Sequence, residues 1–138
     1  MSRFAVVIPQ LPDYPHSRAF DEIALTLVEG LNALGHDAVR SDHARHDDRR
    51  SIVLAPQLLH LWPHSVPEDA ILYNLEQIDR ASTWITPELL QRFRRHTLWD
   101  YSERNREALA SRHGITHATL LPVGYSPGLE RIAPGDRQ

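Results

Sequence analysis

Short apolar runs without polar alternation recur along the chain at nearly regular intervals. The first run is Phe4–Ile8, and Pro9 ends it. A continuous apolar run of this length is typical of a strand covered on both faces, as in a parallel sheet. Similar short apolar runs predict further strands at 51–55, 70–74, 97–99 and 119–123, and a short strand at 37–40 follows the first helix. We therefore expect a mostly parallel sheet of about six strands.

A helical period follows the first strand. Apolar residues recur at three- and four-residue spacing from Phe20 to Leu34, which predicts an amphipathic helix of about five turns. Ser17 stands where a side-chain oxygen can accept a free N–H of the first turn. Gly35 fits the left-handed position just after the helix end. Strand, long helix and strand together predict a right-handed βαβ crossover.

Two shorter helices are each marked by a capping residue. Thr86 precedes Pro87, and proline is well suited to the first helical position because its missing N–H is not needed there. Ser102 is the expected cap of a helix over 103–113, and Gly114 is its expected end.

Two segments carry no clear period. The charged segment 43–50 is predicted to be a solvated loop or a short helix, and 56–69 a short helical or irregular segment. Strands that alternate with helices predict an α/β fold with a single Rossmann-like domain over 1–132 and a disordered tail over 133–138. By analogy we expect the strand order 3-2-1-4-5-6.

Composition narrows the class of protein. A chain of 138 residues and 15.8 kDa is the size of one domain. Fifteen basic against eighteen acidic residues argue against a nucleic-acid partner. The absence of cysteine excludes disulfides and thiolate chemistry. No apolar run approaches the roughly 20 residues of a membrane span, and no signal peptide opens the chain, so we expect a cytoplasmic location.

Polar residues gather directly after several predicted strands. In open α/β sheets ligands bind at the carboxyl ends of the strands, so these residues are expected to share one edge of the sheet. Glu76 and His16 are candidates for acid–base chemistry. The chain carries neither a GxGxxG nor a P-loop motif, so we predict no nucleotide cofactor of those kinds. The candidate site residues are Gln10, His16, Ser17, Asn74, Glu76, Gln77, Asp100, Tyr101, Ser102, Asn105, Gly124 and Tyr125.

Each of these clusters also has a purely structural interpretation. Asn74 and Gln77 can satisfy loop backbone groups, and Glu76 can pair with an arginine. Asp100 can hydrogen-bond the turn, while Ser102 is explained by its capping role. His43 and His46, like His60 and His64, have the spacing of metal ligands, but neither pair lies in a well-predicted helix. We therefore predict no metal site.

Three strings resemble a group of bacterial glycosyltransferase-like proteins. They are ILYNLEQI, LWDYSERN and LLPVGYSPGLERI, which begin at residues 71, 98 and 120. The opening from Val6 to Val39 also looks like the first βαβ unit of the two-domain GT-B fold. The resemblance covers about 4–132 and implies the amino-terminal, acceptor-side half of such an enzyme. It places the candidate residues in the cleft, with Glu76 or His16 as the base.

The resemblance implies that a second half is needed. In GT-B enzymes the nucleotide sugar is usually held by the carboxy-terminal half, and this chain matches only the amino-terminal one. The expected partners are therefore a sugar-containing ligand and a donor-binding chain or a second copy, with no metal and no other cofactor required. One alternative is a non-catalytic protein-interaction module with an apolar patch of Leu58, Leu61, Trp62 and Trp84. Another is a hydrolase using Glu76 and Asp100 as paired carboxylates.

Overall fold

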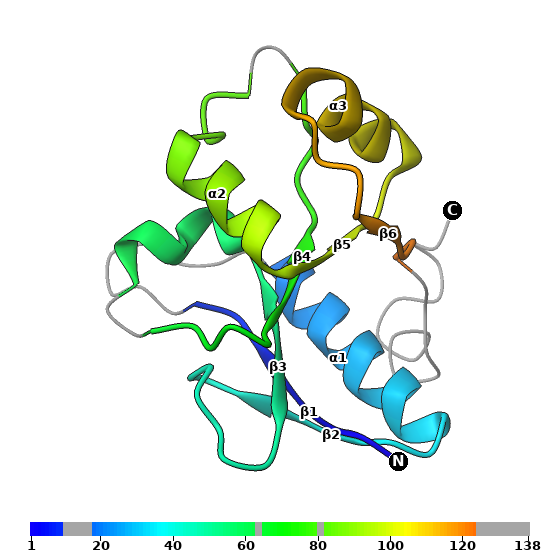
Figure 1. The fold of residues 1–138 in the computed structure, drawn as a ribbon. Helices are drawn as coiled ribbons and strands as arrows, with labels where there is room; N and C mark the ends of the chain where they lie inside the picture. Colours follow the sequence, from blue (N-terminus) through cyan, green and yellow to red (C-terminus); the bar gives the residue numbers. More distant parts are fainter. Residues whose placement is uncertain (10–17, 63–64, 80–81, 124–138) are drawn as a thin grey trace.

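The computed structural model describes residues 1–9, 18–62, 65–79 and 82–123 (Figure 1). The predicted tail and the capping role of Ser17 lie outside these residues. Strands alternate with helices, as the apolar pattern predicted. In chain order the elements are β1 (Arg3–Val7), α1 (Arg18–Ala33), β2 (Asp37–Ser41), β3 (Arg50–Leu54), the 3-10 helix η1 (Pro56–Leu61), β4 (Ile71–Asn74), α2 (Pro87–Arg95), β5 (Thr97–Asp100), α3 (Glu103–His113) and β6 (Thr119–Leu120).

The six strands form one fully parallel sheet in the order β2-β1-β3-β4-β5-β6. The α/β, Rossmann-like class is thus confirmed, but the expected order 3-2-1-4-5-6 is wrong. The reason lies in the two first strands. Residues 5–7 of β1 are fully buried, whereas β2 buries only Ala38 among its five residues. A strand with this many exposed positions suits the edge of a sheet better than its centre.

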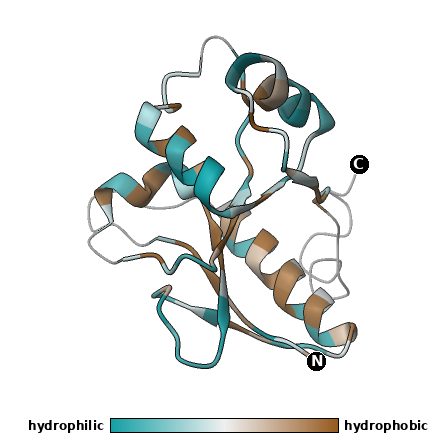
Figure 2. Ribbon diagram, in the orientation of Figure 1, coloured by the Kyte–Doolittle hydropathy of each residue, from teal (hydrophilic) through white to brown (hydrophobic). Residues whose placement is uncertain are grey.

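Two layers cover the two faces of the sheet (Figures 1 and 2). The apolar stripe of α1 packs on one face, over Val6, Ile52 and Tyr73. Helices α2 and α3 and the η1 segment cover the other face, over Val7, Leu72 and related side chains. The sheet is therefore buried between layers of helices, as continuous apolar strands require.

The chain passes from β2 to β3 without a helix (Figure 1). Of the two predictions for the charged segment, the loop is therefore the one observed. Its middle is fixed by Ala44, which is buried in the same cluster as Val7, and by a hydrogen bond from the Ser51 hydroxyl to the Ala44 carbonyl. The loop thus helps to cover this face beside the helices.

The predicted caps of the two shorter helices are confirmed. The Thr86 hydroxyl accepts the Leu89 N–H at 3.1 Å, and Ser102 Oγ accepts the Asn105 N–H at 3.2 Å. Gly114 ends α3 with φ 67°, in the left-handed region that favours glycine. These caps fix where α2 and α3 begin, and the start of α3 borders the candidate site.

The apolar patch proposed for a protein partner does not form. Leu58 and Trp62 are both buried, and Trp62 lies in the same core cluster as Phe93 of α2. Trp84 packs partly against that cluster, and Leu61 is the exposed member. No helix in the described ranges is both long and apolar enough to cross a bilayer.

Candidate functional site

Three buried polar side chains connect the carboxyl ends of β4 and β5. Asp100 is fully buried at the last position of β5, beside Asn74 at the end of β4. Its carboxylate accepts hydrogen bonds from Asn74 Nδ2 at 2.7 Å, from Asn105 Nδ2 at 2.9 Å and from the Ser102 N–H at 2.9 Å. We call Asn74, Asp100 and Asn105 the buried polar triad.

The buried polar triad also holds the loop after β4. The Glu76 carbonyl accepts Nδ2 hydrogen bonds from Asn74 at 3.0 Å and from Asn105 at 2.9 Å. The Ile78 N–H donates to Asn105 Oδ1 at 2.9 Å. Three predicted site residues therefore come together as expected. Their polar atoms are used inside the protein, and burial favours a positioning role over direct ligand contact.

Burial dominates the electrostatics of this edge. It raises the pKa of the Asp100 carboxyl, although the three donated hydrogen bonds and the charge of Arg106 act in the opposite direction. Burial also raises the pKa of Tyr101, and the carboxylates of Asp100 and Glu76 raise it further. The Tyr101 hydroxyl therefore keeps its proton at neutral pH and is available as a hydrogen-bond donor.

A cavity of about 470 Å³ lies directly beside the buried polar triad. Its walls are the loop after β4, the turn after β5 and one face of α3. Four predicted site residues line it, namely Gln77, Tyr101, Ser102 and Asn105. We call this space the carboxyl-edge cavity. It has the size of a site for a small organic ligand.

Sequence reasoning missed other polar residues of the carboxyl-edge cavity. Asp79 comes from the same loop as Gln77, while Arg104, Ser111 and Arg112 come from α3. The helical period could have indicated the residues from α3, because residues four and eight positions after Arg104 lie on the same side of the helix as Arg104. The cavity thus offers carboxylate, hydroxyl, amide and guanidinium groups together.

Glu76 lies apart from the lining of the carboxyl-edge cavity. Its side chain is half-buried, and Oε1 accepts a long hydrogen bond of 3.4 Å from Gln57 Nε2. Gln57 Oε1 is buried and has no hydrogen-bond partner among the described residues. Gln57 arrives here because Ala55 adopts a left-handed conformation, with φ 53°, between β3 and η1. No sequence pattern indicated this contact between Gln57 and Glu76.

Several predicted site residues lie outside the described residues. These are Gln10, His16, Ser17, Gly124 and Tyr125. Within the described part of the chain no group of three or more metal-ligating side chains gathers. His43 and His46 stack on each other at 4.4 Å, and Asp42 Oδ1 lies 2.9 Å from His43 Nδ1. The burial of Asp100 argues against the hydrolase with paired carboxylates, because a catalytic acid must reach its substrate.

Comparisons of the chain with protein-family models, curated proteins and solved structures gave no match. We therefore infer function from the chemistry of the residues around the carboxyl-edge cavity.

Proposed function

We propose that this chain binds a sugar or a glycosylated acceptor in the carboxyl-edge cavity. One observation supports this proposal above the others. The four predicted residues Gln77, Tyr101, Ser102 and Asn105 come from two separate stretches of sequence, and they line a single cavity at the carboxyl ends of β4 and β5. This is where ligands bind in open parallel sheets.

The lining suits a polyhydroxylated ligand. Sugar hydroxyls both donate and accept hydrogen bonds, and the amide of Gln77 and the carboxylate of Asp79 provide both kinds of partner. The Tyr101 ring adds an apolar surface with a protonated hydroxyl at its tip. The buried polar triad fixes the backbone that carries these groups, so little ordering is needed when a ligand binds.

We further propose that the chain is the acceptor-side half of a glycosyltransferase-like unit. The donor-binding half belongs to another chain or to a second copy of this one. In this scheme Glu76 or His16 takes the proton of an acceptor hydroxyl. The hydroxyl oxygen then bonds to the anomeric carbon of the donor, and the bond from that carbon to the diphosphate breaks. The support here is the family resemblance and the presence of Glu76 in the loop after β4, next to the lining residue Gln77, not the strand order.

Binding of the acceptor is tested first. Isothermal titration calorimetry with a panel of simple glycans is expected to identify a ligand for the wild-type chain. Gln77→Ala and Tyr101→Ala should each weaken its affinity about tenfold, the loss of a hydrogen bond or a stacking contact. Gln91→Ala is the matched control, because Gln91 is exposed on α2 and should leave affinity unchanged. If no glycan binds, or if the three variants bind equally, the proposal fails.

The role of Glu76 is tested separately. Glu76→Gln preserves the shape of the side chain and removes its capacity to accept a proton. It should leave glycan affinity within about twofold of wild type, because Glu76 lies outside the cavity lining. Transfer, measured after a donor-binding half is added, should be abolished. Full transfer by this variant would exclude Glu76 as the base.

A further inference from the structure

A second cavity of about 580 Å³ lies near the amino end of β5, and its lining has no residue in common with that of the carboxyl-edge cavity. Helix α2 forms one wall, with Arg92, Arg95 and, just after the helix, His96. The segment that leads into β4 forms the other wall, with Val66 and Glu68. We call this space the α2 cavity. None of the residues predicted from sequence to bind a ligand lines it.

Two guanidinium groups of the α2 cavity have no side-chain partner among the residues that the structure describes. Neither Arg92 nor Arg95 forms a side-chain hydrogen bond or an ion pair with any residue in the described ranges. Arg94 on the same helix differs, because its Nη2 donates to the His113 carbonyl at 3.0 Å. Arg92 is half-buried, so its charge has lost part of its hydration without receiving an acceptor in exchange.

His96 adds a third basic group to this wall. It is 8% exposed, and its Nδ1 is buried without a hydrogen-bond partner in the part of the chain that the structure describes. Burial lowers the pKa of His96, and the charges of Arg92 and Arg95 lower it further, while the backbone at Ala70 and Glu68 raises it. Both guanidinium groups therefore favour the neutral form of the histidine, and the positive charge of this wall comes from Arg92 and Arg95.

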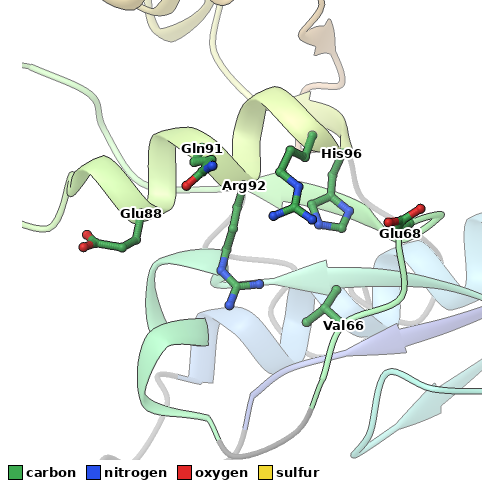
Figure 3. Close-up of a pocket in the computed structure, with 7 residues that line it drawn as sticks. Val66, Glu68, Glu88, Gln91, Arg92 and His96 are labelled. Carbon is green, nitrogen blue, oxygen red and sulfur yellow. The ribbon is translucent and has the colours of Figure 1, made fainter.

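The acidic residues of the α2 cavity leave this charge uncompensated. Figure 3 shows the Glu88 carboxylate directed away from the Arg92 guanidinium, at the far end of the cavity. Glu68 lies beside His96 on the facing segment (Figure 3). Neither carboxylate comes within ion-pair distance of Arg92 or Arg95 in the residues described. A bound anion would supply the acceptors that the chain itself does not provide.

We propose that the α2 cavity binds the phosphate group of a small phosphate monoester through Arg92 and Arg95. A guanidinium offers two parallel N–H donors that match the oxygens of a phosphate, which makes arginine well suited to this role. The volume of the cavity exceeds what a phosphate group alone requires, since a water molecule takes about 30 Å³. The organic part of the ligand lies against Val66 and Gln91. This inference is independent of the glycan-binding proposal.

The test is calorimetry at low salt with inorganic phosphate, glycerol phosphate and acetate as probes. Glycerol phosphate should bind more tightly than inorganic phosphate, and acetate should bind more weakly than either. Arg92→Gln and Arg95→Gln should each weaken binding of glycerol phosphate about tenfold or more. Arg94→Gln removes the same charge from the same helix outside the cavity and should stay within about twofold of wild type. Circular dichroism melting verifies that each variant is folded.

Three results would overturn the inference. The first is no binding of glycerol phosphate by the wild-type chain. The second is an equal loss in Arg94→Gln and Arg95→Gln, which would indicate a diffuse attraction to the charge of the helix. The third is acetate binding as tight as glycerol phosphate, which would exclude recognition of a phosphate. Because Arg95 is exposed, Arg95→Gln remains a valid test even if Arg92→Gln does not fold.

Discussion

Replacing Asp100 by alanine should destabilise the domain by about 3–4 kcal/mol. The substitution removes the acceptor of three buried donors, the Asn74 and Asn105 amides and the Ser102 N–H. A hydrogen bond of this kind contributes about 1 kcal/mol to the free energy of unfolding, and the space left by the carboxylate adds roughly 1 kcal/mol more. The estimate stays moderate because both amides keep their hydrogen bonds to the Glu76 carbonyl.

Urea denaturation followed by circular dichroism measures this loss. The midpoint should fall while the slope against urea stays unchanged, because the same surface is exposed on unfolding. Asp47→Ala is the control, since Asp47 is exposed and its loss should change the free energy by no more than about 0.5 kcal/mol. A loss below about 1 kcal/mol for Asp100→Ala would refute the reasoning that the triad holds the two loops together.

The pH dependence gives a second, independent check on Asp100. Its pKa is raised in the folded state above the ordinary value of 3.8, so the folded protein binds this proton more tightly than the unfolded chain does. The part of the stability that is linked to this proton is therefore fully present below pH 3.8 and is lost as the pH rises through the folded pKa. Asp100→Asn lacks this proton, so the stability of wild type relative to it should fall as the pH rises. The opposite slope would show that the hydrogen-bond donors, not burial, set the direction in which the pKa of Asp100 is shifted.

Three further predictions concern other parts of the fold. Tyr73→Phe removes the hydroxyl that donates to the Leu121 carbonyl and should lower the free energy of unfolding, measured by urea denaturation, by about 1 kcal/mol. Because folding raises the pKa of Tyr73 to about 12, wild type but not the variant should lose this stability as the pH rises from 10 to 12. The Arg49 guanidinium holds the pKa of Asp37 below 3.8, so Asp37→Asn should be less stable than wild type at neutral pH, and the difference should vanish as the pH falls through the folded pKa. Gly114→Ala introduces a side chain at φ 67° and should lower the melting temperature, with a cost of about 1 kcal/mol, whereas an unchanged melting temperature would contradict this.

The helices and strands of this fold were predictable because buried segments consist of apolar residues that can be recognised in the sequence. Continuous apolar runs identified the strands other than β2, and Thr86 and Ser102 identified two helix starts. The order of the strands was not recovered, because a buried run shows that neighbours exist without showing which ones. The polar content of β2 did hold information about its edge position, and the analogy used for the order outweighed it.

The candidate site was predictable in its location but not in its roles. Asn74, Asp100 and Asn105 come together as strand-end reasoning expects. Whether such groups face a ligand or one another depends on side-chain directions that residue types do not encode, since amides and carboxylates serve both purposes.

The α2 cavity was missed for a related reason. Basic residues at the end of a helix are already explained by the helix dipole, so Arg92 and Arg95 carried no distinct signal.

The buried polar triad holds the backbone around the carboxyl-edge cavity, and the exposed side chains that face the cavity are not part of this support. Its buried hydrogen bonds hold the loops after β4 and β5, whereas the Gln77 and Arg104 side chains are exposed and take no part in these hydrogen bonds. Such exposed side chains are free to change without loss of folding, because surface substitutions away from anchoring contacts typically cost no more than about 0.5 kcal/mol. A combinatorial library randomised at these two positions should therefore yield mostly folded members, and the domain offers a constant scaffold on which new ligand preferences can be selected.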